Sequence, residues 1–385
     1  MRIRAIIVVL LLVVWGCKEE FLLKFDTNDE VLVVEGGITN NPGPYLVRIS
    51  TTLPVNQPLR VPFENCEVQI SDQSGNQEIL TEIEPGVYAT SKNGIQGEIG
   101  NAYSLRVVTP DGKEYETVYE EMKDLVDIDS VYAELAVREN LDYPFGLPGY
   151  QFYIDTKPGN DDNNYFLWKL TETYQYESDY TLYALYYYGD MFYTKSDMDQ
   201  IVDIVHLNYD TLYTCWNSEA VQGIYTGQTA NLTVPFVTKQ PLHFVTTETK
   251  KLSIKYSVLV QQYSLSEKAY KFWRSIQDQI SDESFLNTKQ PYNITGNLKN
   301  VKEDAELTYG FFTVASVAQK RVFYTRPNAT FYYDLGYTAE PVELHKKKQP
   351  VYLVLKENAM YYVHPDCVDC RTEGGTITKP DFWVD

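Results

Sequence analysis

Two cysteines near the C-terminus are the residues whose type and spacing most directly suggest chemistry. They form the motif Cys367-Val368-Asp369-Cys370, which follows His364 and Asp366. A zinc site needs about four ligands, which these side chains would have to supply. A redox pair is expected instead at a strand–helix junction with a lowered thiol pKa. We expect the third arrangement, a structural disulfide between Cys367 and Cys370 that holds a tight turn, and we predict no metal ion or other cofactor.

A second segment is rich in oxygen ligands. It reads Pro158-Gly159-Asn160-Asp161-Asp162-Asn163-Asn164, but it lacks the glycine and the bidentate glutamate of a complete calcium loop. Because Asn, Asp and Gly all favour turn geometries, a turn between strands is the preferred interpretation.

Tyrosine is the third unusual feature, with 33 residues of this type in the chain. Tyrosine offers a large, rigid contact area with a polar tip, which suits recognition surfaces. The alternative is that the phenols stand at the solvent edge of strands. A candidate surface for a ligand or partner is formed by six tyrosines close in sequence: Tyr180, Tyr183, Tyr186, Tyr187, Tyr188 and Tyr193.

No catalytic motif is recognisable. The sequence contains no serine nucleophile elbow, zinc-protease histidine pair or phosphate-binding glycine loop. Its four histidines, His206, His243, His345 and His364, have no partner pattern. Glycosidase carboxylates need only be close in space, so a secreted hydrolase stays open as a third hypothesis. We expect no catalytic residues and no enzymatic activity.

The N-terminus predicts export and lipid anchoring. A basic start, Met1 to Arg4, precedes an apolar run from Ala5 to Trp15 and then Gly16 and Cys17. This is the plan of a signal peptide, and the run is shorter than the roughly 20 residues of a spanning helix. The segment Val14-Trp15-Gly16-Cys17 resembles the bacterial lipobox. We therefore predict that residues 1–16 are removed and that Cys17 carries the lipid, which anchors the protein at the membrane.

The residues after Cys17 bear on which side of the membrane is occupied. Lys18, Glu19 and Glu20 resemble a surface-export signal of outer-membrane lipoproteins, although an ordinary solvated tether over residues 17–28 would look similar. The formal net charge is −20, which disfavours nucleic-acid partners because phosphate backbones would be repelled. We expect an outer-membrane lipoprotein exposed on the cell surface.

The elements that position these residues are predicted to be mainly β. Between Val31 and Val118, alternating segments give each strand one buried and one solvated face: Cys66, Val68 and Ile70 in one segment, and Tyr103, Leu105 and Val107 in another. Such short strands predict a small β-sandwich over residues 29–119, of immunoglobulin-like or carboxypeptidase-regulatory-like type.

Residues 120–385 are predicted to form a larger β-rich domain with one prominent amphipathic helix. Ser264 and Glu267 have the spacing of a capping box, after which Ala269, Trp273, Ile276 and Ile280 recur at helical spacing. Phe272 and Trp273 are expected to anchor the core. A long Tyr-rich insertion is expected at about 172–241, and strands are expected at Tyr150–Asp155, Tyr165–Thr171, Lys251–Val258, Tyr309–Ala315 and Arg321–Tyr324.

Several segments of the C-terminal half resemble the family called domain of unknown function 4249. They include Ser264 to Trp273, Gln290 to Leu298, Gly310-Phe311-Phe312, Cys367 to Arg371, Gly374-Gly375-Thr376, and Lys379 to Trp383. The resemblance extends over about residues 28–384, and the terminal motif is its most specific part.

What the resemblance implies is a non-enzymatic accessory or ligand-capture subunit. Members resemble outer-membrane lipoproteins encoded beside TonB-dependent transporters, and the family supplies no catalytic residues. It implies backbone roles for Gly296 and Gly310, core roles for Trp273 and Trp383, and a staple for the terminal cysteines. The alternative function is a stand-alone glycan- or peptide-binding adhesin that uses the region from Tyr180 to Tyr193.

Overall fold

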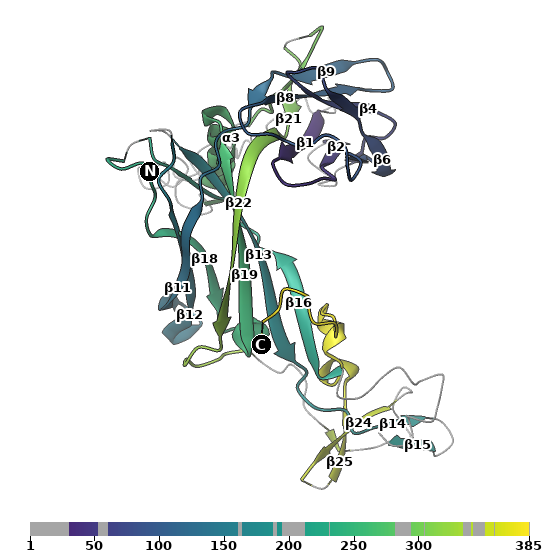
Figure 1. The fold of residues 1–385 in the computed structure, drawn as a ribbon. Helices are drawn as coiled ribbons and strands as arrows, with labels where there is room; N and C mark the ends of the chain where they lie inside the picture. The colour runs from purple at the N-terminus through teal and green to yellow at the C-terminus, as the bar shows by residue number, and fades with distance from the viewer. Residues whose placement is uncertain are drawn as a thin grey trace, which may run out of the picture.

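The protein is mainly β and elongated, with sheets that follow one another along its length (Figure 1). The computed structural model describes residues 31–52, 61–160, 164–187, 191–194, 212–230, 232–281, 294–303, 305–333, 340–341, 351–357 and 359–384. A β-sandwich lies at one end, a central pair of sheets with helix α3 follows, and a small sheet lies at the other end. The predicted β-rich fold class is confirmed.

The N-terminal sandwich has two sheets. One contains β1 (Leu32–Thr39), β2 (Leu46–Thr51), β3 (Val61–Pro62), β6 (Thr81–Glu84) and β7 (Val87–Ala89). The other contains β4 (Glu67–Asp72), β5 (Gln77–Ile79), β8 (Ala102–Val108), β9 (Glu114–Thr117) and β10 (Glu120–Glu121). Val68, Ile70, Leu105 and Val107 are fully buried between the sheets, as their alternation predicts.

Three later strands complete this sandwich. β20 (Leu298–Asn300) pairs with β9, and β21 (Thr308–Tyr309) pairs with β1 in parallel. The first residues of the long strand β22 (Phe312–Thr325) also pair with β1 in parallel. Leu298, Phe312 and Val314 enter the sandwich core. The N-terminal unit therefore combines the described strands between Leu32 and Thr117 with strands from the region that the sequence assigned to the second unit, which include β10.

Two glycines allow the close approach of these late strands. Gly310 separates β21 from β22 and has a φ of 81°, and a Cβ placed there would lie 2.1 Å from the carbonyl oxygen of Val34. Gly296 packs against the same turn, where its Cβ would lie 2.5 Å from the carbonyl oxygen of Gly310. The expected backbone roles of both glycines are confirmed.

The central part of the molecule is a second layered structure. One sheet has the order β16 (Thr214–Ala220), β13 (Tyr165–Glu177), β19 (Lys255–Leu265) and β22, and β17 (Tyr225–Gln228) also pairs with β13. It faces a sheet of β11 (Ile128–Asn140), β12 (Tyr143–Thr156) and β18 (Gln240–Thr246). Phe152, Phe166 and Trp168 are fully buried between them. β22 pairs with β1 at one end and β19 at the other, so one strand joins the two structures.

Helix α3 (Glu267–Ser281) covers the opposite face of the central sheet. Ala269, Tyr270 and Phe272 pack with Leu167, Leu265 and Phe311. The helix begins later than the sequence suggested. Ser264 belongs to β19, and the hydroxyl of Ser266 accepts the backbone N–H of Ala269, so Ser266 is the cap. The expectation that Ser264 caps the helix is wrong because the strand continues to Leu265.

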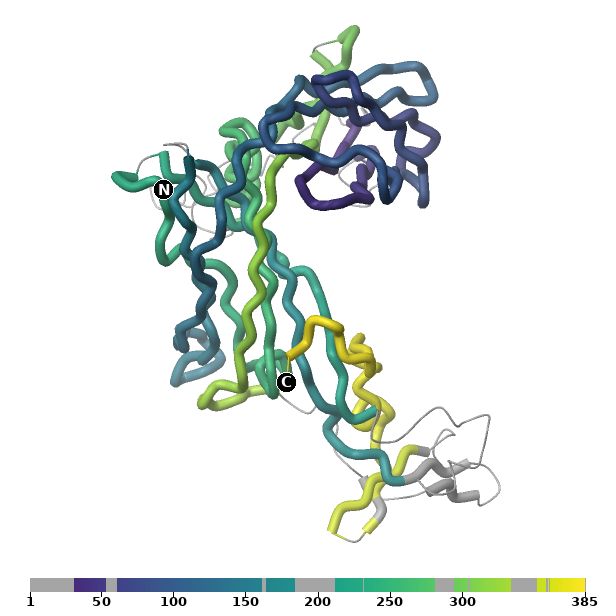
Figure 2. Tube along the Cα trace, in the orientation of Figure 1, coloured from purple at the N-terminus to yellow at the C-terminus, as the bar shows by residue number. Residues whose placement is uncertain are grey.

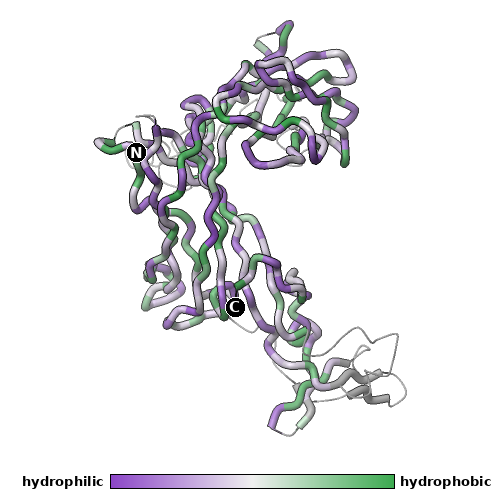
Figure 3. The backbone as a smooth tube through the Cα atoms, viewed as in Figure 1, coloured by the Kyte–Doolittle hydropathy of each residue, from purple (hydrophilic) through white to green (hydrophobic). Residues whose placement is uncertain are grey.

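The small terminal sheet contains β14 (Ala184–Tyr187), β15 (Met191–Thr194), β23 (Glu340–Pro341), β24 (Val351–Lys356) and β25 (Ala359–Val363). After β25 the chain turns back in two 3-10 helices, η4 (Pro365–Cys367) and η5 (Cys370–Glu373), and returns beside β16 (Figure 2). Trp383 ends this return in a buried contact with Phe323 of β22, as its expected core role requires. Hydrophobic and hydrophilic residues alternate along much of the chain (Figure 3).

Candidate functional site

A cavity of about 880 Å³ lies where the N-terminal sandwich, the central sheet and helix α3 meet. β1 and β2 supply one wall, β13 and β19 supply another, and the helix supplies the third. The turn around Gly310 also lines the cavity. This volume is in the range of small-molecule binding sites. The cavity is therefore the leading candidate for a binding site in this protein.

Lys169 is the principal charged group on the wall supplied by the central sheet. Its Nζ atom lies 5.1 Å from the ring centre of Tyr263 and 5.4 Å from that of Trp273. Among the described residues, no carboxylate lies within ion-pair distance of Lys169, and Glu35 is the carboxylate whose charge acts on it from farther away. The side chain is accessible to solvent, but the surrounding protein desolvates its ammonium group and lowers the pKa of Lys169, against the opposing effect of Glu35. The site thus offers a cation that lies beside two aromatic rings and forms no ion pair with a described carboxylate.

The wall supplied by helix α3 is apolar and aromatic. Phe272 stacks on Phe311 with ring centres 4.7 Å apart, and Trp273 and Ile276 extend the same surface. The indole Nε1 of Trp273 is buried and has no hydrogen-bond partner. Such a donor usually finds an acceptor. Phe272 is buried in the core as predicted, and Trp273 is partly buried and packs against the same core cluster; both also line the cavity.

The wall supplied by the sandwich carries two opposite charges. Glu35 of β1 and Arg48 of β2 are directly opposed in the antiparallel register, and both line the cavity. With Lys169, the charged groups of the lining comprise two cations and one carboxylate. The cavity is therefore locally cationic in a chain whose formal net charge is −20.

A second group of charges lies on the other face of β13. Glu172 is buried, and its Oε1 accepts a hydrogen bond of 2.6 Å from Lys251 Nζ while its Oε2 accepts one of 2.8 Å from the hydroxyl of Tyr256. Lys251 Nζ also lies 2.5 Å from Oε1 of Glu219. Burial raises the pKa of Glu172, whereas the bond to Lys251 lowers the pKa of Glu219. We call these four residues and His243 the Glu172 cluster.

His243 completes the Glu172 cluster from β18. Its Nε2 atom lies 3.8 Å from Oε2 of Glu172. Burial, together with the cations Lys251 and Arg138, outweighs that carboxylate and lowers the pKa of His243 to about 4. The histidine is therefore neutral at pH 7. Neither Glu172 nor Glu219 lines the cavity, and both contact one lysine, so the cluster is internally satisfied.

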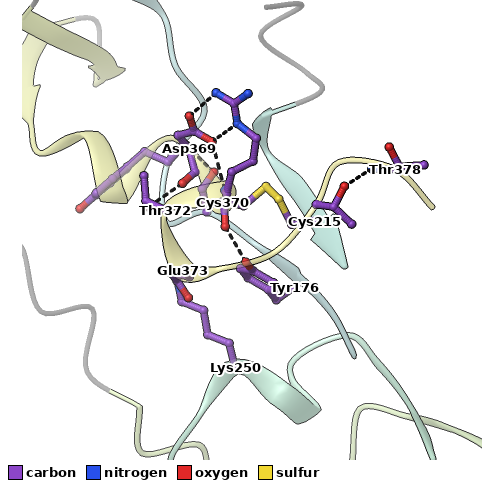
Figure 4. The surroundings of a disulfide bond; sticks show 12 residues. Tyr176, Cys215, Lys250, Asp369, Cys370, Thr372, Glu373 and Thr378 are labelled. Atoms are coloured by element: carbon purple, nitrogen blue, oxygen red, sulfur yellow. Dashed lines mark hydrogen bonds and ion pairs between the residues drawn. A yellow bond between two sulfur atoms is a disulfide. The ribbon is translucent and has the colours of Figure 1, made fainter. Parts of the chain in front are cut away.

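The predicted disulfide between Cys367 and Cys370 is wrong. Cys370 is bonded to Cys215 of β16, a residue 155 positions earlier (Figure 4). The bond ties the returning C-terminal segment to the central sheet. The hydroxyl of Tyr176 donates to the carbonyl oxygen of Cys370 at 2.5 Å, and Lys250 forms a 2.7 Å ion pair with Glu373.

The physical reason is that the two cysteines of the motif face different packing clusters. Cys367 ends η4, and its free thiol is buried with Val363 and Val368 beside the small terminal sheet. Cys370 begins η5 and packs with Tyr176 and Cys215. Within the described residues, no cluster of three or more metal-ligating side chains occurs. Cys66 is the other free cysteine of this part of the chain.

The family comparison can be placed on this geometry. The family model described as Domain of unknown function (DUF4249) matches residues 18–321. The chain belongs to this family. The DUF4249 match contains every residue named above for the cavity, from Val33 to Thr313. It ends before the terminal cysteine motif, which the sequence analysis took as the most specific part of the resemblance. No curated protein matches the chain.

The tyrosine surface predicted for this DUF4249 member is only partly within the described side chains. Tyr180 is half-buried against the core of the small terminal sheet, and its backbone N–H donates to Cys367. Tyr183 is 41% exposed. For Tyr186, Tyr187 and Tyr193 only the strand backbone is described, in β14 and β15, and Tyr188 lies outside the described residues. The proposed recognition role stays a prediction.

The residues of the DUF4249 chain that are predicted to carry the lipid and the export signal, Cys17, Lys18, Glu19 and Glu20, also lie outside the described residues. No helix in the part that was described has the length and apolar character to cross a membrane. Of the suggested calcium segment, Asn160 donates to Asp124 and the backbone N–H of Asn164 donates to Thr229, while residues 161–163 are not described.

Sequence reasoning missed Lys169, and one signal was available. The strand segment Tyr165-Phe166-Leu167-Trp168-Lys169-Leu170 is apolar or aromatic except for this lysine. A single cation inside such a segment is unusual unless it faces a cavity or a partner. Glu35, Arg48 and Tyr263 carried no comparable local signal.

Proposed function

We propose that this protein is a non-enzymatic lipoprotein of the outer-membrane surface that captures a small ligand and acts as an accessory subunit of a TonB-dependent transporter. The observation that carries the ligand-capture part is the cavity between the sandwich, the central sheet and helix α3. The anchor and the transporter partner rest on the sequence features around Cys17 and on what the family resemblance implies.

The lining of the cavity favours binding over catalysis. Its described lining contains no cysteine, histidine, serine or aspartate, and Glu35 is its one carboxylate. Glycoside hydrolysis by the usual route needs two carboxylates across the substrate. Aromatic walls with a few polar groups are instead typical of a small-molecule binding site.

The position of the cavity fits a tethered protein. β1, whose residues Val33 and Glu35 line the cavity, is the first described strand after Cys17. A lipid on Cys17 would hold the cavity within a short chain length of the membrane surface. A protein held beside a transporter can work by concentrating ligand at the transporter entrance.

The anchor is tested by changing Cys17. We expect the wild-type protein to fractionate with outer membranes and to show the mass of a lipid on the peptide that begins at Cys17. Cys17→Ala should remove that mass and release the protein from the membrane. Lys18→Ala and Glu19→Ala together with Glu20→Ala should leave the lipid and reduce access of surface protease to the protein. A membrane-bound, unmodified Cys17→Ala variant would refute the anchor.

The partner is tested by gentle detergent extraction with an affinity tag after Asp385. We expect a large β-barrel protein with a TonB-dependent transporter sequence to copurify at a fixed ratio. The matched control is an unrelated lipoprotein with the same tag, expressed at the same level. Recovery of the tagged chain alone after mild crosslinking in intact cells would contradict the proposal.

A further inference from the structure

We infer that the cavity binds a small organic anion with an apolar body, and that Lys169 is the counter-ion of its acidic group. This inference rests on the capture function proposed above and names the class of ligand. It is carried by three observations: an ammonium group that lines a cavity and forms no ion pair with a described carboxylate, two aromatic rings beside this group, and apolar side chains in the same lining.

The arrangement of Lys169 argues against a cationic ligand. Aromatic faces attract cations within about 6 Å of the ring centre. Here the faces of Tyr263 and Trp273 are already in contact with the ammonium group of Lys169, at 5.1 and 5.4 Å. A second cation would meet the positive charge of Lys169, whereas an anion would be attracted to it. The two ring faces are therefore occupied by Lys169 and do not form an aromatic cage for a cationic ligand.

Arg48 and Glu35 leave the net charge of the cavity lining positive. They are register partners on β1 and β2, so the one carboxylate of the lining has a cation on the neighbouring strand, and the attraction between Glu35 and Lys169 is smaller than the desolvation of the ammonium group. The ammonium group of Lys169 lies beside Tyr263 and Trp273 in the cavity lining, and desolvation lowers its pKa. An arriving anion would replace lost solvation and form a charge-assisted hydrogen bond, which is stronger than one between neutral groups.

The remaining lining specifies the rest of the ligand. Leu167, Phe272, Ile276, Ile294 and Phe311 present apolar surface around Lys169. An inorganic anion such as phosphate would leave this surface in contact with water, so the hydrophobic effect would contribute nothing to its binding. A cavity of about 880 Å³ accommodates an apolar ring or chain beside the acidic group.

Two fluorescent probes separate the charge from the apolar body. One is 8-anilinonaphthalene-1-sulfonate, which carries an anion, and the other is N-phenyl-1-naphthylamine, which has the same rings without it. With purified protein that lacks residues 1–17, we expect one saturable site that binds the sulfonate at least tenfold more tightly. 3-Phenylpropionate should displace it, and 3-phenylpropionamide should displace it at least tenfold less well.

Variants then assign the charge to Lys169. Lys169→Met should weaken sulfonate binding about tenfold and leave the neutral probe within about twofold. Lys169→Arg, which keeps the charge, should restore most of the affinity. The matched control is Lys271→Met on helix α3, which removes the same charge from an exposed lysine outside the cavity lining. This control should bind both probes as the unmodified protein does.

Several results would overturn the inference. They are equal affinity for the two probes, equal losses of both in Lys169→Met, or a sulfonate affinity unchanged by that substitution. If Lys169→Met does not fold, the preference of the unmodified protein for phenylpropionate over phenylpropionamide decides. The assay uses no transporter, so a failure here is separate from failure of the copurification. A protein that copurifies with a transporter but binds both probes equally keeps its proposed role and loses this ligand class.

Discussion

The charged side chains on the two faces of β13 differ in whether they form ion pairs. On the face toward β12 and β18, Glu172 is bonded to Lys251 and Tyr256, and the indole of Trp168 donates to Gln262 at 2.9 Å. On the face toward helix α3, Lys169 lies beside Tyr263 and Trp273 and forms no ion pair with a described carboxylate, although the charge of Glu35 acts on it. Polar groups that are fully bonded to one another maintain a fold, whereas a charge left without a partner is available to a ligand.

The same contrast extends along the strand. We call the face of β13 toward β12 and β18 the closed face. Beyond Glu172 it continues to Tyr176, whose hydroxyl donates to the carbonyl oxygen of Cys370, the residue that forms the disulfide with Cys215. This end of β13 is therefore hydrogen-bonded to a segment that the disulfide ties to the neighbouring strand β16. We call the face of β13 toward helix α3, which carries Lys169, the open face. We expect substitutions on the closed face to alter mainly stability, and substitutions on the open face to alter mainly binding.

The largest expected effect comes from removing the disulfide. Cys215→Ala together with Cys370→Ala should lower the free energy of unfolding by about 4 kcal/mol, because the bond closes a long loop in the unfolded chain. Urea unfolding would measure the change. The control, Cys367→Ala, should cost only about 1 kcal/mol, since it shortens a small buried side chain. Equal losses in both, or a Cys367–Cys370 peptide in non-reducing mass spectrometry, would support the motif pairing instead.

The next effect concerns the buried ion pair. Glu172→Ala leaves Lys251 and Tyr256 without their buried acceptor, so it should cost about 3 kcal/mol of unfolding free energy. Glu219→Ala is the matched control, because Glu219 contacts the same lysine but its side chain is 40% exposed. It should cost less than about 1 kcal/mol. Similar costs for the two would show that the cluster is not closed in solution.

The pH dependence tests the same cluster. The pKa of His243 is lowered to about 4 from an ordinary 6.5, so between these values the unfolded chain binds more protons. Stability from this group is therefore complete above pH 6.5 and is lost as the pH falls toward 4. At pH 5 the loss is about 2 kcal/mol, compared with pH 8. His243→Gln should remove that part of the pH dependence in urea unfolding measured across this range. An unchanged profile would contradict the buried, neutral histidine.

Local patterns predicted part of this molecule well. Period-two alternation placed Val68, Ile70, Leu105 and Val107 in the core, because it depends only on neighbouring residues in one strand. The helix was predicted from its own spacing, but its cap was misplaced at Ser264 because a capping box cannot reveal where the preceding strand ends.

Long-range contacts were not predictable in this way. Four cysteines remain after Cys17, and they allow three sets of pairings, so nothing local distinguished Cys215 from Cys367 as the partner of Cys370. The cavity also depends on β1 pairing in parallel with a strand from much later in the chain, which brings Glu35 and Arg48 opposite Lys169. The sequence showed that Lys169 is an unusual residue in its strand, but it did not show that this lysine lines a cavity.

The smallest expected effect is the most informative about the open face. Lys169→Met should change the free energy of unfolding by less than about 1 kcal/mol, because the side chain is exposed and solvent screens its charge. The surroundings of Lys169 disfavour its charged form, and methionine keeps the apolar contacts of the stem without that cost. Thermal and urea unfolding at pH 7 would measure it beside Glu172→Ala. A loss of unfolding free energy as large as that of Glu172→Ala would mean that Lys169 stabilises the fold. A residue that serves a ligand should instead show loss of anion binding with unchanged stability.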